Sequence, residues 1–424
     1  MKRALRFCML ATFYPPFSFG GDAIQVERLA VALADRGHDV TVVHSREAHR
    51  ALSHSRPDGE PGHPRVRVIP IDAGVGLLSP LATYLTGRPL LVQRRLERAL
   101  DGDFDVVHFH NPSLLGGPAA LRLGSGIKLY TAHEQWLVCP THVLWKYRRR
   151  VCESPTCWRC CLTYGRPPQL WRSGELIERS LGELDALIAP SRTSMRLHER
   201  FSRLVRIQQI GHFVAEPPVP AAPDAEPERP YFLFVGRLEP IKGIDWLVRA
   251  FARRTGPEEL VIAGRGSLED SLRREIAGLP NVRFVGWQAP QGLDRLYRGA
   301  RAVVTPTLGH EAFALVPVES YAHGTPTIVR NFGALGELLA ESGGGLGFRS
   351  EAELHEALDR LASDDALRAE LGERGRNAHR ALWSVDVHLA RYLGLIADLA
   401  RERGDLELAA AAEDAARPDE VVAS

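Results

Sequence analysis

Short apolar runs alternate along the chain with longer stretches in which apolar residues recur every three or four positions. The short runs have the length of buried strands and lie at residues 5–11, 39–43, 105–110, 127–131, 185–189, 231–235, 260–263, 282–285, 301–304 and 327–329. The helical period is clearest at residues 23–36, 244–254, 290–299 and 351–403. Strands that alternate with helices form βαβ units, so the pattern predicts an α/β protein with parallel sheets.

A proline-rich segment separates this pattern into two halves. Residues 216–229 contain five prolines and no aromatic residue, which is typical of a semi-rigid linker. We therefore predict an N-terminal domain at residues 1–213, a linker at 214–230 and a C-terminal domain at 231–383. A chain of 424 residues is long enough for two such domains. The alanine- and acid-rich residues 409–424 are predicted to be disordered.

Composition excludes some classes of protein. With 45% hydrophobic and 25% charged residues, the chain resembles ordinary soluble globular proteins. A net charge of +1 gives no electrostatic basis for binding nucleic acid. No apolar run reaches the roughly 18 residues that a membrane-spanning helix needs.

The N-terminus could be taken for a signal peptide, but Arg6 interrupts its apolar run and no small-residue cleavage site follows. We expect a strand there instead. The cytoplasm is then the default compartment, and thiols stay reduced in it.

Two carboxylates, Glu311 and Glu319, are separated by seven residues. Pro317 lies between them and can open a helix, because its missing N–H costs nothing in the first turn. We expect a loop at residues 311–316, since proline disfavours the helical conformation of the residue before it, and a helix at 317–323.

This loop and helix could hold an anion. The N–H groups of Phe313, Ala314 and Leu315 and the helix N-terminus suit a diphosphate. Each carboxylate can accept hydrogen bonds from neighbouring hydroxyl groups of a ribose or a hexose. A nucleotide sugar has phosphates between two such groups of hydroxyls. The alternative is that Glu311 and Glu319 are solvated surface charges.

Two cations follow the strand predicted at residues 231–235. Arg237 leaves the strand end and Lys242 precedes the next helix. This arrangement would neutralise a diphosphate and the charge that grows on it when a sugar departs. From the residues alone, both could equally be ordinary surface side chains.

The N-terminal half carries its own candidates at the ends of strands. Gly20 and Gly21 open the helix at 23–36, where a glycine pair suits an approaching anion or simply a tight turn. His133 follows the strand at 127–131, and ligands of doubly wound sheets bind at such carboxyl ends. His108 and His110, in the preceding strand, are interpreted as packing or surface residues.

These motifs resemble those of the retaining glycosyltransferases of the large GT-B family four. The resemblance rests on the E-x7-E signature of Glu311 and Glu319, on the G-R-x-x-x-x-K-G segment at residues 236–243 and on the R-G-H-D-V-T-V run at 36–42. It implies two Rossmann-like domains that face an interdomain cleft, with the first domain on the acceptor side. The helix at residues 384–408 would return to that first domain. One departure is Ala312-Phe313-Ala314, where the family has Gly-Phe-Gly.

The resemblance also implies roles for these residues. Glu311 would contact the donor sugar, Glu319 the ribose and Arg237 and Lys242 the diphosphate, while His133 faces the sugar from the other domain. The enzyme would then move a hexosyl group from a UDP-, GDP- or dTDP-linked sugar to an acceptor hydroxyl with retention of configuration. No cofactor is implied for catalysis. The acceptor could be a polysaccharide precursor, a lipid-linked sugar or a small molecule. The alternatives are a non-catalytic sugar-nucleotide-binding subunit and another GT-B enzyme, a phosphorylase or an epimerase.

Five of the six cysteines lie between residues 139 and 161. Cys157 and Cys160 form a C-x2-C pair, and Cys139 and Cys152 could complete four thiolates around a structural zinc ion. Free buried thiols and a disulfide are the alternatives. The segment interrupts the βα rhythm, so we interpret residues 139–172 as an insertion on the acceptor side. Its basic, aromatic-rich surface could contact an acidic acceptor or the headgroups of the inner face of a membrane, or could be solvated.

Overall fold

The computed structural model describes residues 3–52, 63–219 and 227–417. The chain divides into two compact units. The first comprises Met1–His142, Thr156–Gly211 and Val385–Ser424, and the second comprises Val143–Pro155 and His212–Ser384.

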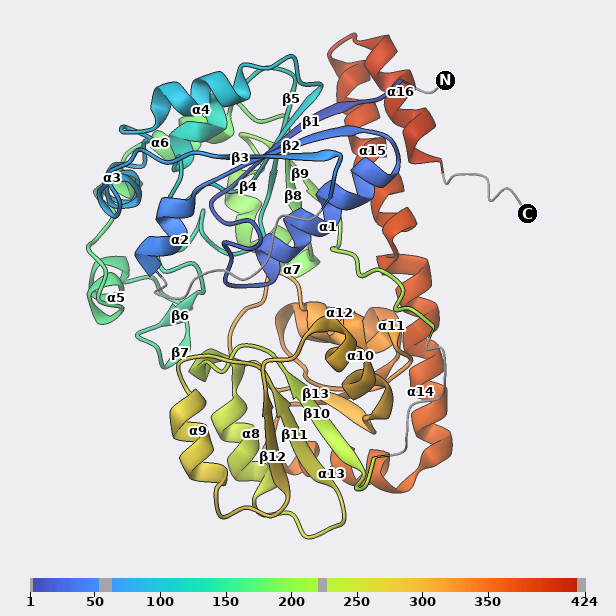
Figure 1. The fold of residues 1–424 in the computed structure, drawn as a ribbon. Coiled ribbons are helices and arrows are strands. Elements are labelled where there is room, and N and C mark those ends of the chain that lie inside the picture. Colours follow the sequence, from blue (N-terminus) through green and yellow to red (C-terminus); the bar gives the residue numbers. More distant parts are fainter. Residues whose placement is uncertain (1–2, 53–62, 220–226, 418–424) are drawn as a thin grey trace. The chain divides into compact units, whose positions relative to one another are not determined.

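The first unit is built on a parallel sheet of seven strands in the order β3-β2-β1-β4-β5-β8-β9 (Figure 1). The strands are β1 (Arg6–Ala11), β2 (Asp39–His44), β3 (Val66–Pro70), β4 (Val106–Asn111), β5 (Ile127–Thr131), β8 (Ala186–Ala189) and β9 (Arg206–Gln209). All residues of β4, β5 and β8 are buried, as expected for strands covered by helices on both faces. The strand order reverses between β1 and β4, and in such sheets ligands bind beside the carboxyl ends of the two strands where the order reverses.

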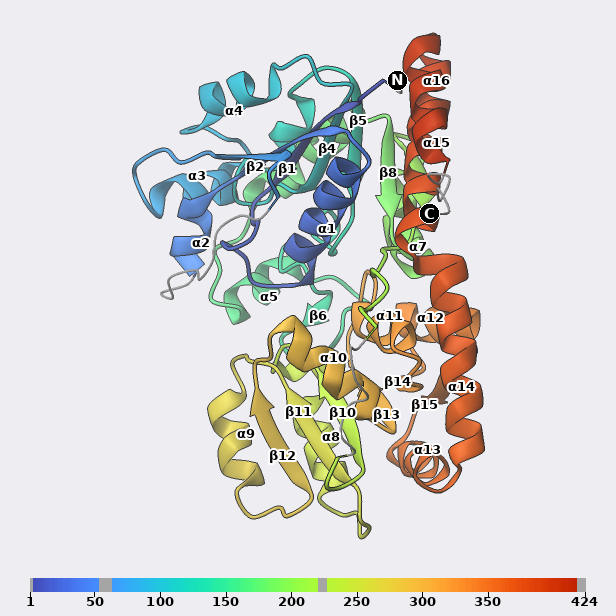
Figure 2. The ribbon, with the colours of Figure 1, turned by 45° about the vertical axis from the view of Figure 1, so that its right-hand side comes forward.

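The helices of the first unit come from three parts of the chain. They are α1 (Gly21–Asp35), α2 (Arg46–Leu52), α3 (Leu78–Thr86), α4 (Gln93–Leu100), η1 (Pro118–Arg122), α5 (Cys157–Thr163), η2 (Leu170–Ser173), α6 (Leu176–Leu181), α7 (Arg192–His198), η3 (Glu199–Phe201), α15 (Val385–Glu402) and α16 (Leu406–Ala416). α15 joins the sheet through its Tyr392, whose hydroxyl lies 3.0 Å from Nδ1 of His108 on β4. The last long helix is thus part of the N-terminal unit (Figure 2).

The second unit holds a parallel sheet of six strands in the order β12-β11-β10-β13-β14-β15. The strands are β10 (Tyr231–Val235), β11 (Glu259–Ala263), β12 (Val282–Gly286), β13 (Ala302–Thr305), β14 (Thr327–Arg330) and β15 (Gly345–Phe348). Its helices are η4 (Pro240–Lys242), α8 (Ile244–Phe251), α9 (Glu269–Ile276), α10 (Pro290–Gly299), α11 (Leu315–Ala322), α12 (Gly333–Ser342), α13 (Glu351–Ser363), α14 (Asp365–Ala378) and η5 (His379–Trp383). Here the order reverses between β10 and β13. Loops after these two strands therefore meet at one edge.

The inserted segment does not stay in one unit. The hairpin of β6 (Trp145–Lys146) and β7 (Arg150–Val151) belongs to the second unit, whereas α5 and η2 belong to the first. Within the second unit, a Cβ on Gly309 would lie 3.5 Å from the ring of Trp145. The single N-terminal insertion predicted at residues 139–172 is therefore divided between the two units.

Two local expectations were wrong. Residues 409–416 of the predicted disordered tail form most of α16, in which Leu408, Ala409 and Ala412 are buried; residues 418–424 lie outside the described residues. Small alanine side chains let α16 pack closely on α15, and Asp405 caps its N-terminus. Helix α11 begins at Leu315 rather than Pro317. Proline is tolerated there because the N–H groups of the first turn have no partner within the helix.

Candidate active site

An ion pair lies where the loops after β10 and β13 meet. Nζ of Lys242 lies 2.7 Å from Oε1 of Glu311, and the Thr307 hydroxyl donates to the same oxygen at 2.8 Å. The two charged side chains are 23% and 15% exposed, so the pair is largely shielded but reachable by a ligand. The sheet order explains the pairing, because β10 and β13 are neighbours although they are far apart in sequence.

The backbone of the loop after β10 is held very close to the loop after β13. Gly243 has a φ of 72°, and a Cβ there would lie 2.5 Å from the carbonyl oxygen of Pro306. The N–H of Leu308 also donates to the carbonyl of Ile241 at 2.8 Å. Only glycine fits this crossing, and it fixes Lys242 beside Glu311. Arg237, in the same loop, is exposed.

Glu319 lies on α11 and is held by a residue that the sequence did not point to. The hydroxyl of Tyr297 on α10 donates to Oε2 of Glu319 at 2.9 Å. Tyr297 is itself buried and stacks on His323 with ring centroids 4.9 Å apart. A tyrosine in a helix carries no motif, so nothing in the sequence could have singled out Tyr297 or Thr307.

The residues between the two glutamates offer backbone rather than side chains. The side chain of Phe313 is buried in a core cluster that includes Val214, and its ring lies edge-on to His212 at 5.3 Å. Ala312 and Ala314 are buried as well. Ala314, which precedes α11, has no side chain that could cap the helix, so the N–H groups of the first turn can receive an anion.

In the first unit His133 follows β5 and pairs with His110 at the end of β4. Nε2 of His133 lies 2.9 Å from Nδ1 of His110. Burial, followed by the nearby His110 and His388, lowers the pKa of His133 well below its usual value. His133 is therefore neutral near pH 7 and offers a hydrogen bond without a charge. His108 and His110 are both buried, as packing residues are, but sequence reasoning missed the contact of His110 with His133.

Gly20 and Gly21 lie at the start of α1 as predicted. Gly20 precedes the helix in extended conformation, with no capping side chain, and the nearest atom to an added Cβ is Oδ1 of Asp22 at 3.4 Å. Neither the backbone nor a neighbour therefore requires glycine at position 20. The backbone at Gly20 therefore leaves space for a ligand beside the N-terminus of α1.

We expect the melting temperature to fall as the pH is lowered from about 6.5 to about 4. Burial lowers the pKa of His44 and of His388 to about 4 from an ordinary 6.5. Between these values the unfolded chain binds protons that the folded chain does not, so the stabilisation present above pH 6.5 is lost on acidification. Thermal melts at constant ionic strength would measure the melting temperature at each pH. His388→Gln should flatten the profile and His355→Gln should not; a flat profile for the unaltered protein would contradict the expectation.

The cysteines form a cluster that also contains an arginine. Cys157, Cys160 and Cys161 lie on α5, and burial and then the neighbouring thiols, including Cys139, raise the pKa of Cys157 and Cys161. Arg172 donates to the carbonyl oxygens of Trp136 and Leu137, at 2.7 and 3.2 Å. Burial lowers its pKa to about 10, against the effect of the nearby thiols. A guanidinium thus supplies positive charge beside these sulfurs.

The predicted zinc ligands come from both units. Cys152 belongs to the second unit and Cys139, Cys157 and Cys160 to the first. Within residues 3–52, 63–219 and 227–417, no three His, Cys, Asp or Glu side chains are placed to hold a metal ion. Among the described residues no cysteine is part of a disulfide. The zinc site therefore stays a prediction.

Comparison with known proteins identifies the family. Residues 219–378 match the family model described as Glycosyl transferases group 1, and residues 19–214 match the one described as Glycosyltransferase Family 4. The glycogen synthase of Mycobacterium tuberculosis (strain CDC 1551 / Oshkosh) is 30% identical over 406 residues, which cover 90% of this chain and 91% of that protein. The chain belongs to the group 1, family 4 glycosyltransferases.

Two further comparisons agree with this. The phosphatidyl-myo-inositol mannosyltransferase of Mycobacterium leprae (strain TN) is 28% identical over 388 residues, covering 87% of this chain and 92% of that protein. The crystal structure of HepE from Anabaena in complex with UDP-glucose superposes with a TM-score of 0.63 at 17% identity, covering 95% of this chain and 100% of that chain. The protein is a glycosyltransferase, and its fold is GT-B, with two Rossmann-like domains.

Proposed function

We propose that this glycosyltransferase moves a hexosyl group from a nucleoside diphosphate sugar to an acceptor hydroxyl, with retention of anomeric configuration. The observation that carries the proposal is the ion pair of Lys242 and Glu311, at the same sheet edge as α11 with its second carboxylate, Glu319. A cation, uncapped N–H groups and two carboxylates match the phosphates and the two sugar rings of such a donor.

The donor would change the partners of Lys242. In the structure its ammonium group is neutralised by Glu311, which is 2.7 Å away. A diphosphate at the N-terminus of α11 would compete for that ammonium and leave Glu311 to accept hydrogen bonds from hexose hydroxyls. Glu319, oriented by Tyr297, would accept from the ribose hydroxyls. Arg237 is exposed near the same edge and adds a second cation for the phosphates.

Retention with these groups requires no protein nucleophile. As the bond between the anomeric carbon and the diphosphate oxygen breaks, negative charge grows on the phosphate, where Lys242 and Arg237 stabilise it. The acceptor oxygen forms its bond on the face that the phosphate leaves. The acceptor proton passes to the departing phosphate oxygen, so the products are the glycoside and the nucleoside diphosphate. Neutral His133 would donate or accept a hydrogen bond at a sugar hydroxyl.

A donor screen tests the proposal. UDP-, GDP- and dTDP-linked hexoses are compared by thermal shift, because a ligand that binds only the native state raises the melting temperature. The donor that binds is then incubated with candidate acceptors, and the anomeric configuration of the product is read by NMR. Failure of every sugar nucleotide to bind would overturn the proposal. Release of a sugar phosphate in the presence of inorganic phosphate would indicate a phosphorylase, and a changed sugar configuration in the nucleotide an epimerase.

From the spacing of the cysteines alone, we propose a structural zinc ion held by Cys139, Cys152, Cys157 and Cys160. Four sulfurs would leave no open position for water, so the metal would do no chemistry. We expect about one zinc per chain by elemental analysis of protein purified without added metal. Cys152→Ser should lower the zinc content and Cys8→Ser, outside the cluster, should not. Metal-free protein with all thiols reactive in the native state would contradict the proposal.

A further inference from the structure

Glu134 and His142 form a carboxylate–imidazole pair just after β5, and no step of the proposed reaction uses it. Nδ1 of His142 lies 2.6 Å from Oε1 of Glu134, and the side-chain amide of Asn111 donates to the same oxygen at 2.8 Å. Asn111 is the last residue of β4, the neighbour of β5 in the sheet. Glu134 directly follows His133, the residue assigned to the sugar. The pair therefore lies at the edge of the first unit where a substrate is expected.

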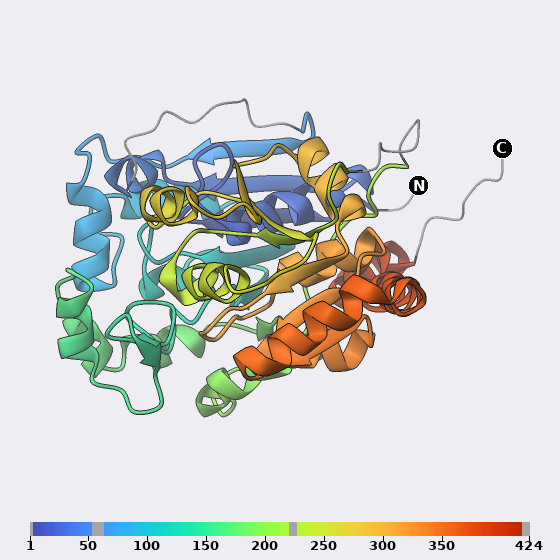
Figure 3. The same cartoon turned by 90° about the horizontal axis from the view of Figure 1, so that it is seen from below.

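The backbone between the two side chains is closed into a compact loop. Residues 132–144 contain no helix or strand, and Figure 3 draws this part of the chain as an irregular trace, teal to green. The N–H of Gln135 donates to the carbonyl oxygen of His142 at 3.0 Å, and the N–H of His142 donates to that of Cys139 at 3.0 Å. His142 has a φ of 73°, which is uncommon for a residue with a side chain. The loop thus holds His142 beside Glu134 in a strained conformation of the kind that gathers at binding sites.

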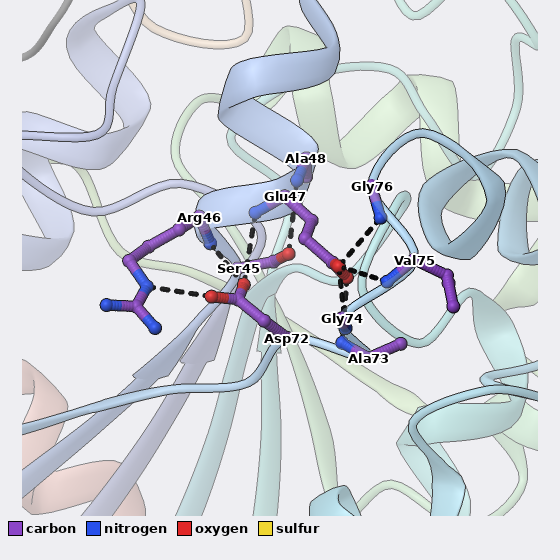
Figure 4. Close-up of polar contacts among 9 residues, drawn as sticks. All are labelled: Ser45, Arg46, Glu47, Ala48, Asp72, Ala73, Gly74, Val75 and Gly76. Carbon is purple, nitrogen blue, oxygen red and sulfur yellow. Dashed lines mark hydrogen bonds and ion pairs between the residues drawn. The ribbon is translucent and has the colours of Figure 1, made fainter.

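Two other carboxylates near the same edge of the sheet have the contacts of purely structural side chains (Figure 4). Glu47 accepts hydrogen bonds of 2.8–3.0 Å from the four consecutive N–H groups of residues 73–76, and these bonds use both of its oxygens. Asp72 also uses both. Its Oδ1 accepts from the N–H groups of Arg46 and Glu47, and its Oδ2 accepts from the Arg46 guanidinium. All four oxygens are therefore occupied in holding the loops after β2 and β3.

Glu134 differs from these two residues because one of its oxygens is left over. Across the described part of the chain, Oε2 of Glu134 has no hydrogen-bond or ion-pair partner, and neither has Nε2 of His142. The two side chains are 27% and 16% exposed, so a ligand can reach them. No lysine or arginine among the described residues pairs with either side chain.

Both of these atoms accept hydrogen bonds. A carboxylate oxygen only accepts, so Nδ1 of His142 carries the proton that it shares with Glu134, and Nε2 of the uncharged ring is then an acceptor. Such acceptors match the O–H groups of a sugar or another polyol. A phosphate group does not match them, because its oxygens are themselves mainly acceptors and its negative charge is repelled by the carboxylate.

We propose that Glu134 and His142 bind hydroxyl groups of the acceptor and restrict the enzyme to acceptors that present an unphosphorylated sugar or polyol ring at this site. The inference rests on the proposed function, in which the first unit takes the acceptor and His133 contacts the transferred sugar. Asn111 is a positioning residue. The N–H of Ser113 donates to its Oδ1 at 3.2 Å, which turns the NH2 group of the amide toward Glu134.

Titration by saturation-transfer NMR, with the full chain and without donor, tests this proposal. The probes are myo-inositol and the methyl glycosides of glucose, galactose and mannose, each paired with its monophosphate. We expect at least one neutral probe to bind and its phosphate to bind about 10-fold more weakly or worse. Glu134→Gln should weaken binding of that neutral probe by about 10-fold, the lower end for a lost hydrogen bond to a charged group. Glu134→Lys should reverse the preference within the pair, which loss of a merely structural contact would not do.

Matched variants separate recognition from misfolding. Glu178→Gln, at an exposed glutamate of α6, should leave the affinities of both probes unchanged. His142→Gln keeps a donor for Glu134 and should weaken binding of the neutral probe even if Glu134→Lys fails to fold. The proposal is overturned if no neutral probe binds, if the phosphate binds as tightly, or if Glu134→Gln behaves like Glu178→Gln. Since no donor is present, a failed donor screen would count against the proposed transfer and leave this result readable.

Discussion

Lys242→Ala is expected to lower kcat by about 100- to 1,000-fold, the range seen when one preorganised donor to a developing negative charge is removed. The close crossing of the two loops at Gly243 fixes the backbone beside Lys242, whose ammonium group lies 2.7 Å from Glu311. It is therefore in place before the diphosphate begins to leave. Affinity for the intact donor should fall less, because the charge on the phosphate is greatest in the transition state.

Steady-state kinetics and calorimetry with the intact donor would measure the two effects of Lys242→Ala separately. Arg237→Ala should likewise lower kcat more than it lowers affinity for the intact donor. Lys242→Arg should recover only part of the rate, because a planar guanidinium does not replace a compact ammonium. Arg249→Ala, on the exposed side of α8, is a matched control in the same unit. A change in KM alone would mean that Lys242 binds donor and transition state equally.

Glu319→Ala is expected to weaken binding of the free nucleoside diphosphate by about 5- to 150-fold, equivalent to about 1–3 kcal/mol. Two ribose hydroxyls would lose their acceptor. Tyr297→Phe should have a smaller effect in the same direction, because it removes only the 2.9 Å bond that orients the carboxylate. Isothermal titration calorimetry with UDP, GDP and dTDP would measure both.

Glu311→Ala should have the reverse effect of Glu319→Ala, because it should lower turnover without weakening nucleotide binding. Its carboxylate is proposed to face the hexose, so the free nucleoside diphosphate should bind as before or more tightly, since Lys242 is released from its partner. Turnover should fall strongly. Glu373→Ala, an exposed glutamate on α14, serves as the control. Equal loss of nucleotide affinity in Glu311→Ala and Glu319→Ala would contradict the separate roles proposed for them.

Local pattern was sufficient for most of the secondary structure. Strands β5 and β10 and helix α10 have the bounds that the sequence predicts, because a short apolar run and a helical period each leave one way to bury the side chains. The first residue of a helix was less well predicted. The start of α11 was placed two residues late, since a proline in the first turn does not say which residue of that turn it occupies.

The spacing of Glu311 and Glu319 pointed to the candidate site, but their partners came only from the tertiary structure. Lys242 meets Glu311 because β10 and β13 are adjacent, and strand order is not written in any local pattern. The same holds for His110 beside His133 and for Tyr297 beside Glu319. Each partner lies on a neighbouring element and carries no motif of its own.

By itself the sequence determined the two-domain α/β plan and the segments that carry charge at the carboxyl ends of strands. Tertiary packing decided how the inserted segment is shared between the units and that residues 409–416 join α16, because burial depends on which surfaces meet. It also decided that the leucines of α3 face outward. A sequence pattern shows which side of a helix is apolar, but only the fold determines whether that side is covered.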